Sequence, residues 1–231
     1  MRKVTSILSI VSIIISASFL SFYLVDILTS PDRVFLKSLS SVVEIKASTD
    51  DIESFGTAVI FSDTELITNF HVVSFTSDSI VYIHDLIEIR FPNSDIYQEV
   101  TVERYDTSLD LVLLIMNDTR GKSVKINKLN YSTGQNVILL GNGNNLGISI
   151  TTGVISRKEV GITYNNNSNK YIQVDATSTN GVSGGALLDR YGRLIGIITL
   201  RLLDNNGTPI YGYVYAVPIS SVLEFYNLDN K

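Results

Sequence analysis

A serine flanked by three glycines is the stretch of this chain best suited to nucleophilic chemistry. It consists of Asn180-Gly181-Val182-Ser183-Gly184-Gly185. Glycine allows positive φ and lets another group approach the backbone closely. A nucleophilic serine needs both freedoms, because its Oγ must stand clear of the chain while nearby N–H groups point at the oxygen that becomes negative. The structural alternative for these six residues is an ordinary turn between strands, since Gly, Ser and Asn are common turn residues.

The chain order of histidine, acid and serine separates the known arrangements of a nucleophilic serine. The stretch fits a G-x-S-x-G elbow, but there the histidine follows the serine. His71 and His84 are the only histidines, and both precede Ser183. The subtilisin order, which is acid, histidine and then serine, could use Asp51 or Asp63. The helix-rich α/β pattern of the subtilisin fold, however, is missing from this chain. Of the two histidines, His84 alternates with apolar neighbours and is expected on an exposed strand face.

The order that remains is histidine, aspartate, serine, as in the chymotrypsin arrangement, and it selects His71, Asp110 and Ser183. Asp110 enters a run of leucine and valine, where a carboxylate is costly to bury unless it is paired. Asp106 is the nearby alternative, but it precedes the apolar run. In the catalytic interpretation, His71 takes the serine proton and Asp110 holds the imidazole tautomer. The N–H groups of Gly181 and Ser183 then bind the oxyanion.

Composition excludes several other functions. The 231 residues carry a formal net charge of −5 and contain no run of lysine and arginine, which argues against a nucleic-acid partner. There is no cysteine, so disulfides and thiolate metal sites are excluded. Two histidines without a carboxylate cluster do not predict a zinc site. The expected chemistry therefore needs no cofactor and no metal.

The N-terminal segment, residues 1–28, differs from the rest of the chain. Arg2 and Lys3 precede an uncharged, mostly apolar run, Val4–Val25. Its 22 residues would span roughly 33 Å as a helix, enough for a bilayer core. The basic N-terminal side predicts a single-pass anchor with the body extracytoplasmic. The alternative is a secretory signal peptide cleaved near Ser16-Ala17-Ser18, which would release a secreted protein.

The remainder of the chain predicts an all-β domain after a short linker. Ser30-Pro31 is typical of a helix start, so residues 29–40 are expected to form a linker or short helix. About a dozen short Val-, Ile-, Tyr- and Thr-rich stretches follow, separated by turn residues, which indicates a sandwich or barrel. The expected domain, 41–231, divides into a first barrel at about 41–116, a second at about 132–217 and a C-terminal helix at 218–228. That helix would start at a capping box, Ser221-Val222-Leu223-Glu224.

Blocks around the three candidate residues resemble, in order and spacing, the protease domain of the HtrA/Deg family of trypsin-like serine proteases. The histidine block, the aspartate block, the start of the second barrel, the serine block and the closing strand are, in turn, 56–60 with 68–73, 106–114, 134–143 with 152–156, 172–187 and 213–218. The resemblance covers Ser41 to the C-terminus. The blocks are specific as a set, whereas any one of them would be a weak signal.

This resemblance implies an all-β, two-barrel chymotrypsin/trypsin-like fold with His71, Asp110 and Ser183 in the cleft between barrels. The second barrel would form the S1 pocket, which receives the side chain before the cleaved bond. By matching positions, its expected lining is Thr177, Ser178, Thr199, Leu200, Arg201 and Gly212. No acid stands at Thr177, so a small or medium apolar side chain is favoured over Lys or Arg. Arg201 near the rim leaves an acidic preference open.

Three features depart from the family pattern. Val182 replaces the Asn or Asp usual before the serine, and a β-branched residue there can change how readily the oxyanion loop forms. Asn142-Gly143-Asn144 lacks the usual proline. The chain stops after one helix, so no PDZ domain is expected, and peptide sensing or assembly through such domains is not carried over.

The sequence therefore favours a membrane-anchored serine endopeptidase that hydrolyses exposed or unfolded polypeptides. The alternative is a catalytically weak or inactive protease-fold module that binds peptides or proteins, motivated by Val182 and the missing PDZ domain. A structural β protein with chance motifs is the third interpretation. Four N-x-S/T sequons are treated as chance matches in an Asn-rich chain; they begin at Asn117, Asn130, Asn166 and Asn206.

Overall fold

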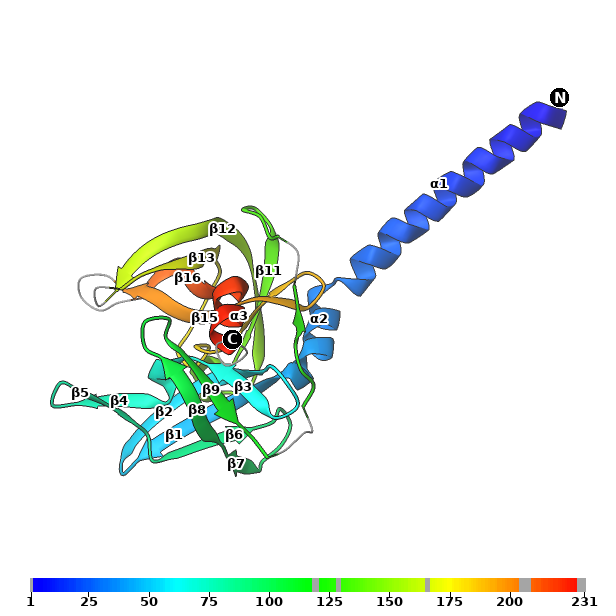
Figure 1. Cartoon of the computed structure of the whole chain (residues 1–231). Helices are drawn as coiled ribbons and strands as arrows, with labels where there is room; N and C mark the ends of the chain where they lie inside the picture. The colour runs from blue at the N-terminus through cyan, green and yellow to red at the C-terminus, as the bar shows by residue number, and fades with distance from the viewer. Residues whose placement is uncertain (1, 118–120, 128–129, 165–166, 204–208, 228–231) are drawn as a thin grey trace.

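Helices lie near both termini of the chain, and the strands between them form a β-rich body (Figure 1). The computed structural model describes residues 2–117, 121–127, 130–164, 167–203 and 209–227; Asn166 and Asn206 lie outside them. The helical elements are α1 (Arg2–Leu28), α2 (Pro31–Ser38), η1 (Leu39–Ser41), η2 (Phe70–Val72), η3 (Gly143–Asn145) and α3 (Ile219–Tyr226). The strands are β1 (Val42–Thr49), β2 (Ile52–Ile60), β3 (Glu65–Thr68), β4 (Ser74–Ser77), β5 (Ile80–Ile83), β6 (Leu86–Arg90), β7 (Tyr97–Glu99), β8 (Thr101–Asp106), β9 (Leu111–Ile115), β10 (Lys125–Ile126), β11 (Asn136–Gly141), β12 (Ser149–Tyr164), β13 (Asn167–Asp175), β14 (Ala186–Asp189), β15 (Arg193–Leu203) and β16 (Pro209–Pro218).

The strands form two barrel-like sheets that follow one another along the chain. The first has the order β7-β6-β1-β2-β3-β9-β8, and the second β10-β15-β14-β11-β12-β13-β16. In the second sheet β15 also pairs with β16, so the strands from β15 round to β16 close on themselves. The mostly-β architecture expected from the sequence is thereby confirmed. The short strand β10 lies in the stretch between the two expected barrels.

Apolar side chains fill the interior of each barrel-like sheet and the space between the two sheets. One cluster lies within the first sheet and includes Ile45, Ile89 and Leu114. A second cluster lies within the second sheet. The third cluster joins Val59 and Leu111 of the first sheet to residues of the second, and α3 adds buried side chains to it. Because this shared cluster is apolar and buried, the hydrophobic effect holds the two sheets against each other.

Helix α3 is fixed to both sheets, but its start differs from the expectation. Pro218 occupies the N-cap position and the helix begins at Ile219, so Ser221 lies inside the first turn and the predicted capping box is wrong. Proline pre-sets an extended residue before the helix and leaves no side-chain hydroxyl to cap it. At the other end, Arg104 of β8 donates hydrogen bonds to the carbonyls of Phe225 and Tyr226.

Two segments project from the body. Figure 1 shows α1 extending away from it; residues Ser6–Leu28 of this helix are exposed, have a mean hydropathy of 2.2, and are long and apolar enough to cross a membrane. The β4–β5 hairpin projects on another side. Its two turn residues, Asp78 and Ser79, have positive φ, as a tight hairpin turn requires. The hairpin follows η2 directly and therefore stands beside whatever site His71 forms.

Replacing Phe225 with alanine is expected to lower the free energy of unfolding by about 3–5 kcal/mol. The ring is 1% exposed and belongs to the cluster shared by both sheets, so its removal leaves a cavity. Urea unfolding of the full chain in detergent measures the loss. Ile96→Ala, at a side chain that is 63% exposed, should stay within about 0.5 kcal/mol of the wild type. A loss below about 1 kcal/mol for the Phe225 variant would contradict the shared core.

Candidate active site

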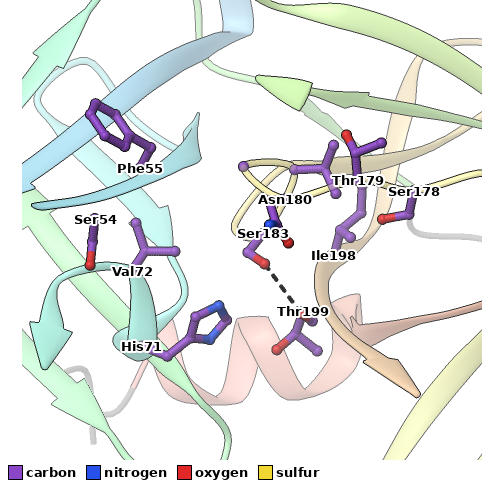
Figure 2. Close-up of a pocket in the computed structure, with 12 residues that line it drawn as sticks. Ser54, Phe55, His71, Val72, Ser178, Thr179, Asn180, Ser183, Ile198 and Thr199 are labelled. Carbon is purple, nitrogen blue, oxygen red and sulfur yellow. Dashed lines mark hydrogen bonds between the residues drawn. The ribbon is translucent and has the colours of Figure 1, made fainter. Parts of the chain in front are cut away.

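Two of the three residues selected by chain order, His71 and Ser183, line one cavity, and the third, Asp110, bonds to His71. His71 is in η2 at the end of β3, Asp110 immediately precedes β9, and Ser183 lies in the loop before β14. His71 and Ser183 line a cavity of about 210 Å³. Figure 2 shows the His71 imidazole directed across this cavity toward the Ser183 loop. The first sheet thus contributes the histidine and the aspartate, and the second contributes the serine.

The carboxylate of Asp110 holds the His71 imidazole. Asp110 Oδ2 lies 2.7 Å from His71 Nδ1, and Asp110 Oδ1 accepts the His71 backbone N–H at 2.9 Å. The Thr199 hydroxyl donates a second bond to Oδ2 at 2.6 Å. A carboxylate at Nδ1 favours the tautomer that carries its proton there, which leaves Nε2 as the acceptor on the cavity side. This arrangement is suited to a general base.

Asp106 is placed elsewhere and does a different job. One of its carboxylate oxygens, Oδ1, accepts the N–H groups of Ser108 and Leu109 at 2.8 and 3.0 Å and the Ser108 hydroxyl at 2.7 Å. This is a side-chain-stabilised turn of the kind that Asp commonly forms. The turn leads the chain into Asp110, whose φ of 55° is left-handed. Asp106 therefore shapes the loop that presents Asp110, and Asp110 is the acid that reaches His71.

Buried Asn69 joins the loop that contains Asp110 to the loop before β14 that contains Ser183, here called the serine loop. Its Nδ2 donates to the Asp110 carbonyl at 2.9 Å, and its Oδ1 accepts the Gly184 N–H at 2.7 Å. The Phe70 N–H also donates to the Asp110 carbonyl, at 3.2 Å. Asn69 was not a site residue in the sequence interpretation. Its place beside the histidine was visible in the sequence, but its two partners are 41 and 115 residues away.

Glycine is required at two positions of the serine loop because of its surroundings. Gly184 has φ of 79°, and a Cβ there would lie 2.0 Å from Thr68 Oγ1 and 2.1 Å from the Thr57 carbonyl oxygen. Gly181 has φ of 89°, and a Cβ there would lie 2.2 Å from the Asn142 carbonyl oxygen. No L-residue with a side chain fits either position without moving backbone. The glycines thus let the loop pack directly on neighbouring chain.

The N–H groups of Gly181 and Ser183 are the oxyanion donors that the sequence predicts, and the hydrogen bonds around them set the direction of the Gly181 N–H. The Asn180 carbonyl accepts the Asn144 N–H at 2.7 Å, and the Gly181 carbonyl accepts the Thr57 hydroxyl at 2.8 Å. In a planar trans peptide the N–H points opposite to the C=O. The Gly181 N–H therefore points away from Asn144. Within the described residues, neither it nor the Ser183 N–H donates a hydrogen bond, so both remain available.

The hydroxyl of Ser183 rests against the second sheet. Ser183 Oγ donates a long hydrogen bond of 3.4 Å to the Thr199 carbonyl, drawn as a dashed line in Figure 2. In the described part of the chain, no hydrogen bond joins it to His71. Hydrogen bonds between a nucleophile and its base are often long or misaligned without substrate and tighten in the complex. A bond of 3.4 Å is weak enough to be exchanged for one to Nε2 by rotation about χ1.

The cavity contains part of the expected S1 lining. Ser178 and Thr199 line it, whereas Thr177 is exposed and is not among the lining residues. Leu200 and Arg201 belong to β15 and Gly212 to β16, but the surroundings of these three positions are not described, so this part of the expected lining stays a prediction. Ile198, which the sequence interpretation did not select, also lines the cavity. Ser178 is 9% exposed, and its hydroxyl has no hydrogen-bond partner within the described structure.

The other wall of the cavity includes residues that sequence reasoning missed. Ser54 and Phe55 of β2 line it together with Val72. Behind them lies His84, which is 4% exposed, so its predicted exposed position is wrong. His84 Nε2 lies 3.2 Å from Ser54 Oγ, and its ring centroid lies 4.9 Å from that of Phe75. Burial lowers the pKa of His84. The hairpin covers this histidine, which local alternation of residues could not reveal.

Replacing Asn69 with alanine is expected to weaken the whole site. The change leaves the Gly184 N–H and the Asp110 carbonyl each without one hydrogen bond, at a cost of about 1–3 kcal/mol for a group left unsatisfied. Urea unfolding measures this loss, and reaction of Ser183 with a fluorophosphonate probe measures the displacement of its loop. Asn127→Ala is the matched control, because Asn127 is also buried but donates to Asp189, away from the cavity. Equal probe reactivity of the two variants would contradict the bridging role of Asn69.

Comparison with known proteins gives the same assignment of family. Residues 56–197 match the family described as trypsin-like peptidase domain. The serine endoprotease DegS of Salmonella typhimurium is 33% identical over 191 residues, which cover 80% of this chain and 50% of DegS. DegS of Haemophilus influenzae is 30% identical over 191 residues, 81% of this chain and 53% of the relative. A solved structure of the HtrA-type protease AlgW with a tripeptide is 26% identical with a TM-score of 0.75, over 86% of this chain and 63% of that one.

These relatives set the extent of what is shared. The chain spans about half the length of the curated relatives that it matches, so the likeness concerns the protease domain. The resemblance to HtrA/Deg proteases expected from the sequence blocks is confirmed. With more than half of its residues matched to the family and with an HtrA-type fold around the cavity, this chain belongs to the trypsin-like peptidases and is similar to their HtrA/Deg serine endoproteases.

Proposed function

We propose that this chain is a membrane-anchored serine endopeptidase that hydrolyses peptide bonds in exposed or unfolded polypeptide segments. The observation that carries the proposal is the Asp110–His71 pair, which faces the Ser183 loop across one cavity in a chain of the trypsin-like peptidase family. A carboxylate-oriented imidazole beside a glycine-framed serine is the arrangement that acyl transfer requires. The cavity is open to a polypeptide, since His71 keeps 48% of its side chain exposed.

The proposed mechanism uses groups of this chain alone. Ser183 Oγ attacks the carbonyl carbon while His71 Nε2 accepts its proton, and Asp110 stabilises the resulting imidazolium. The N–H groups of Gly181 and Ser183 donate to the oxyanion of the tetrahedral intermediate. The imidazolium then protonates the departing amine, which leaves an acyl-enzyme on Ser183. Water, deprotonated by His71, attacks the ester, and collapse of this second intermediate returns the proton to Ser183.

The domain assignment belongs to the same proposal. Residues 1–28 form the anchor, 29–40 the linker with its short helix, and 41–231 the protease domain. The exposed apolar stretch of α1 supports the anchor, and a signal sequence near the N-terminus, which is also a long apolar helix, is the alternative. Arg2 and Lys3 at its start favour an extracytoplasmic protease domain. A secreted form follows if the segment is cleaved near residues 16–18.

A second candidate function is peptide or protein binding with little hydrolysis. Two observations favour it. Val182 stands next to the proposed nucleophile, where the HtrA/Deg pattern usually has Asn or Asp. The resting Ser183 hydroxyl is bonded to the Thr199 carbonyl, and not to the base. If the loop does not bring the hydroxyl to His71 when a peptide binds, the cavity can hold a peptide without cleaving it.

Ser183→Ala and His71→Ala are each expected to abolish covalent labelling by a fluorophosphonate and to reduce peptide hydrolysis by at least about 10³-fold, because the nucleophile and its base act as a unit. Gel fluorescence after labelling and release of a fluorogenic peptide are the measurements, made on the full chain in detergent. Asp106→Asn is the matched control, since Asp106 shapes the neighbouring turn and does not reach His71. Undiminished peptide hydrolysis by the Ser183 variant would refute the proposal that this chain is a serine endopeptidase acting through Ser183.

The same experiment separates the two candidate functions. Absence of labelling and turnover in the folded wild type, with peptide binding unchanged by Ser183→Ala, would favour the binding module. Labelling of the wild type with loss in both variants would favour the endopeptidase. Unfolding curves for each variant show whether a loss of labelling comes from the site or from the fold.

We infer that Ser178 and Ile198 help to set the substrate side chain accepted before the cleaved bond. Both line the cavity, whose volume of about 210 Å³ suits a small or medium side chain. Ser178→Val adds bulk to the lining and is expected to lower kcat/KM for the largest accepted side chain at least tenfold relative to alanine, since a methylene in such a pocket is worth about 10–200-fold. Cleavage profiles of peptide libraries measure this. The neighbouring exposed Thr177 provides the control, and an equal shift for Thr177→Val would contradict the assignment.

A further inference from the structure

A buried carboxylate lies between the first sheet and the turn that supports the serine loop. The side chain of Glu44, on β1, is 6% exposed. Its Oε2 accepts hydrogen bonds from Arg90 Nη2 of β6 at 2.6 Å and from Asn142 Nδ2 at 3.2 Å. Burial of a carboxylate is costly unless it is paired and hydrogen-bonded, and Glu44 has both kinds of partner. The ion pair with Arg90 therefore stabilises the buried carboxylate. The carboxylate in turn holds the Asn142 side chain through a hydrogen bond.

Asn142 organises the turn that follows β11. The residue is fully buried. Besides Glu44, its Nδ2 contacts Asn145 Oδ1 at 3.1 Å, and its Oδ1 accepts the Gly147 N–H at 2.9 Å. Its backbone N–H donates to the Thr57 hydroxyl at 2.8 Å. The turn is thus wrapped around one side chain whose orientation Glu44 fixes from outside the turn.

This turn directly contacts residues 179–181, which contain the proposed oxyanion donor Gly181. The Asn144 N–H donates to the Asn180 carbonyl at 2.7 Å. The Asn142 carbonyl lies against Gly181, where a Cβ would come within 2.2 Å of it. Gly143 faces Thr179, whose Oγ1 would lie 2.8 Å from a Cβ at residue 143. Three consecutive residues of the turn therefore pack on three consecutive residues that precede Ser183.

The bond from Asn144 decides which way the peptide between Asn180 and Gly181 faces. With its carbonyl turned to Asn144, the peptide presents the Gly181 N–H on the other side, where an oxyanion donor is needed. Rotation of this one peptide would exchange the two groups and bring a carbonyl oxygen toward the developing negative charge. Gly181 offers little resistance to such a rotation, because glycine is conformationally permissive.

We propose that Glu44 is a positioning residue for the oxyanion hole. Through Asn142 it holds the 142–147 turn, and the turn holds the Asn180–Gly181 peptide with its N–H toward the reacting carbonyl. Glu44 touches neither substrate nor nucleophile; it acts at a distance through a hydrogen-bonded chain that begins at the buried ion pair with Arg90. The effect on hydrolysis rests on the proposed endopeptidase function, whereas the effect on the turn does not.

The second sheet contains a matched control. Asp189 is 1% exposed, accepts Arg193 Nε at 2.7 Å and accepts Asn127 Nδ2 at 3.0 Å. It is therefore a second buried carboxylate with one arginine and one asparagine as partners. Its other hydrogen bonds come from the N–H groups of Tyr191 and Arg193 in its own β-turn, and in the described part of the chain none joins its carboxylate to the serine loop. Glu44 and Asp189 resemble each other in burial and bonding and differ in what they support.

The test compares Glu44→Ala, Glu44→Gln and Asp189→Asn in the full chain in detergent. Glu44→Ala is expected to lower kcat by about 10- to 100-fold with little change in KM, because displacing an oxyanion donor affects the transition state and deleting one costs about 10²–10³-fold. The rate of fluorophosphonate labelling should fall in parallel. Glu44→Gln keeps an acceptor for Asn142 and should recover part of the loss. Asp189→Asn should reduce stability while kcat of the folded protein stays within about twofold of wild type.

A second measurement does not depend on hydrolysis. Hydrogen exchange of peptides covering residues 142–147 should be at least tenfold faster in Glu44→Ala and unchanged in Asp189→Asn, because the Asn144 N–H loses its fixed acceptor. Exchange and labelling in Glu44→Ala that match those in Asp189→Asn would overturn the inference. Failure of the endopeptidase proposal would look different, since wild type would then neither label nor hydrolyse. In that case the exchange result alone decides whether Glu44 holds the turn.

Discussion

The site depends on hydrogen bonds that cross from one barrel-like sheet to the other. Asn69 Oδ1 accepts the Gly184 N–H, the Thr57 N–H donates to the Ser183 carbonyl at 2.9 Å, and the Thr199 hydroxyl donates to Asp110. The donors and acceptors are buried or half-buried, so leaving any one unmade would carry a desolvation cost. The apolar cluster shared by the sheets brings them together without direction. The polar bonds then fix the offset at which histidine and serine face each other.

Residues 179–181, which precede Ser183 and contain one proposed oxyanion donor, are held by the same kind of hydrogen bond. Thr57 connects three segments, since its hydroxyl accepts the Asn142 N–H and donates to the Gly181 carbonyl, while its carbonyl accepts the Thr68 hydroxyl at 2.6 Å. The glycines of the serine loop are needed because neighbouring backbone lies too close for a Cβ. A loop held by this many fixed dipoles requires little reorganisation when charge develops. Among the described contacts, the Ser183 hydroxyl has a single long hydrogen bond, which leaves it able to rotate.

Sequence order by itself determined the candidate chemistry and the fold class. Two histidines, both ahead of the serine, eliminated the elbow arrangement, and Asp110 at the start of an apolar run was the acid that reached His71. Local patterning also determined the exposed apolar N-terminal helix and the β-rich body, because period-two alternation and long apolar runs are local properties. The N-cap of α3 was misplaced by three residues, because the Ser-x-x-Glu pattern suggested Ser221 whereas Pro218 occupies the position.

Tertiary structure alone decided which polar residues serve the site. Asn69, Asn142 and Glu44 were not selected from the sequence, because the hydrogen bonds that join them to other segments reach residues 41 to 115 positions away along the chain. His84 was placed on a surface by its alternation, yet a hairpin covers it, and Thr177 was placed in a pocket by position, yet it is exposed. Chain order specifies which groups exist and in what sequence, whereas burial and hydrogen-bond partners arise only when distant segments pack. For this protein the sequence therefore selected the candidate reacting residues, and the packing of two sheets decided how they are held.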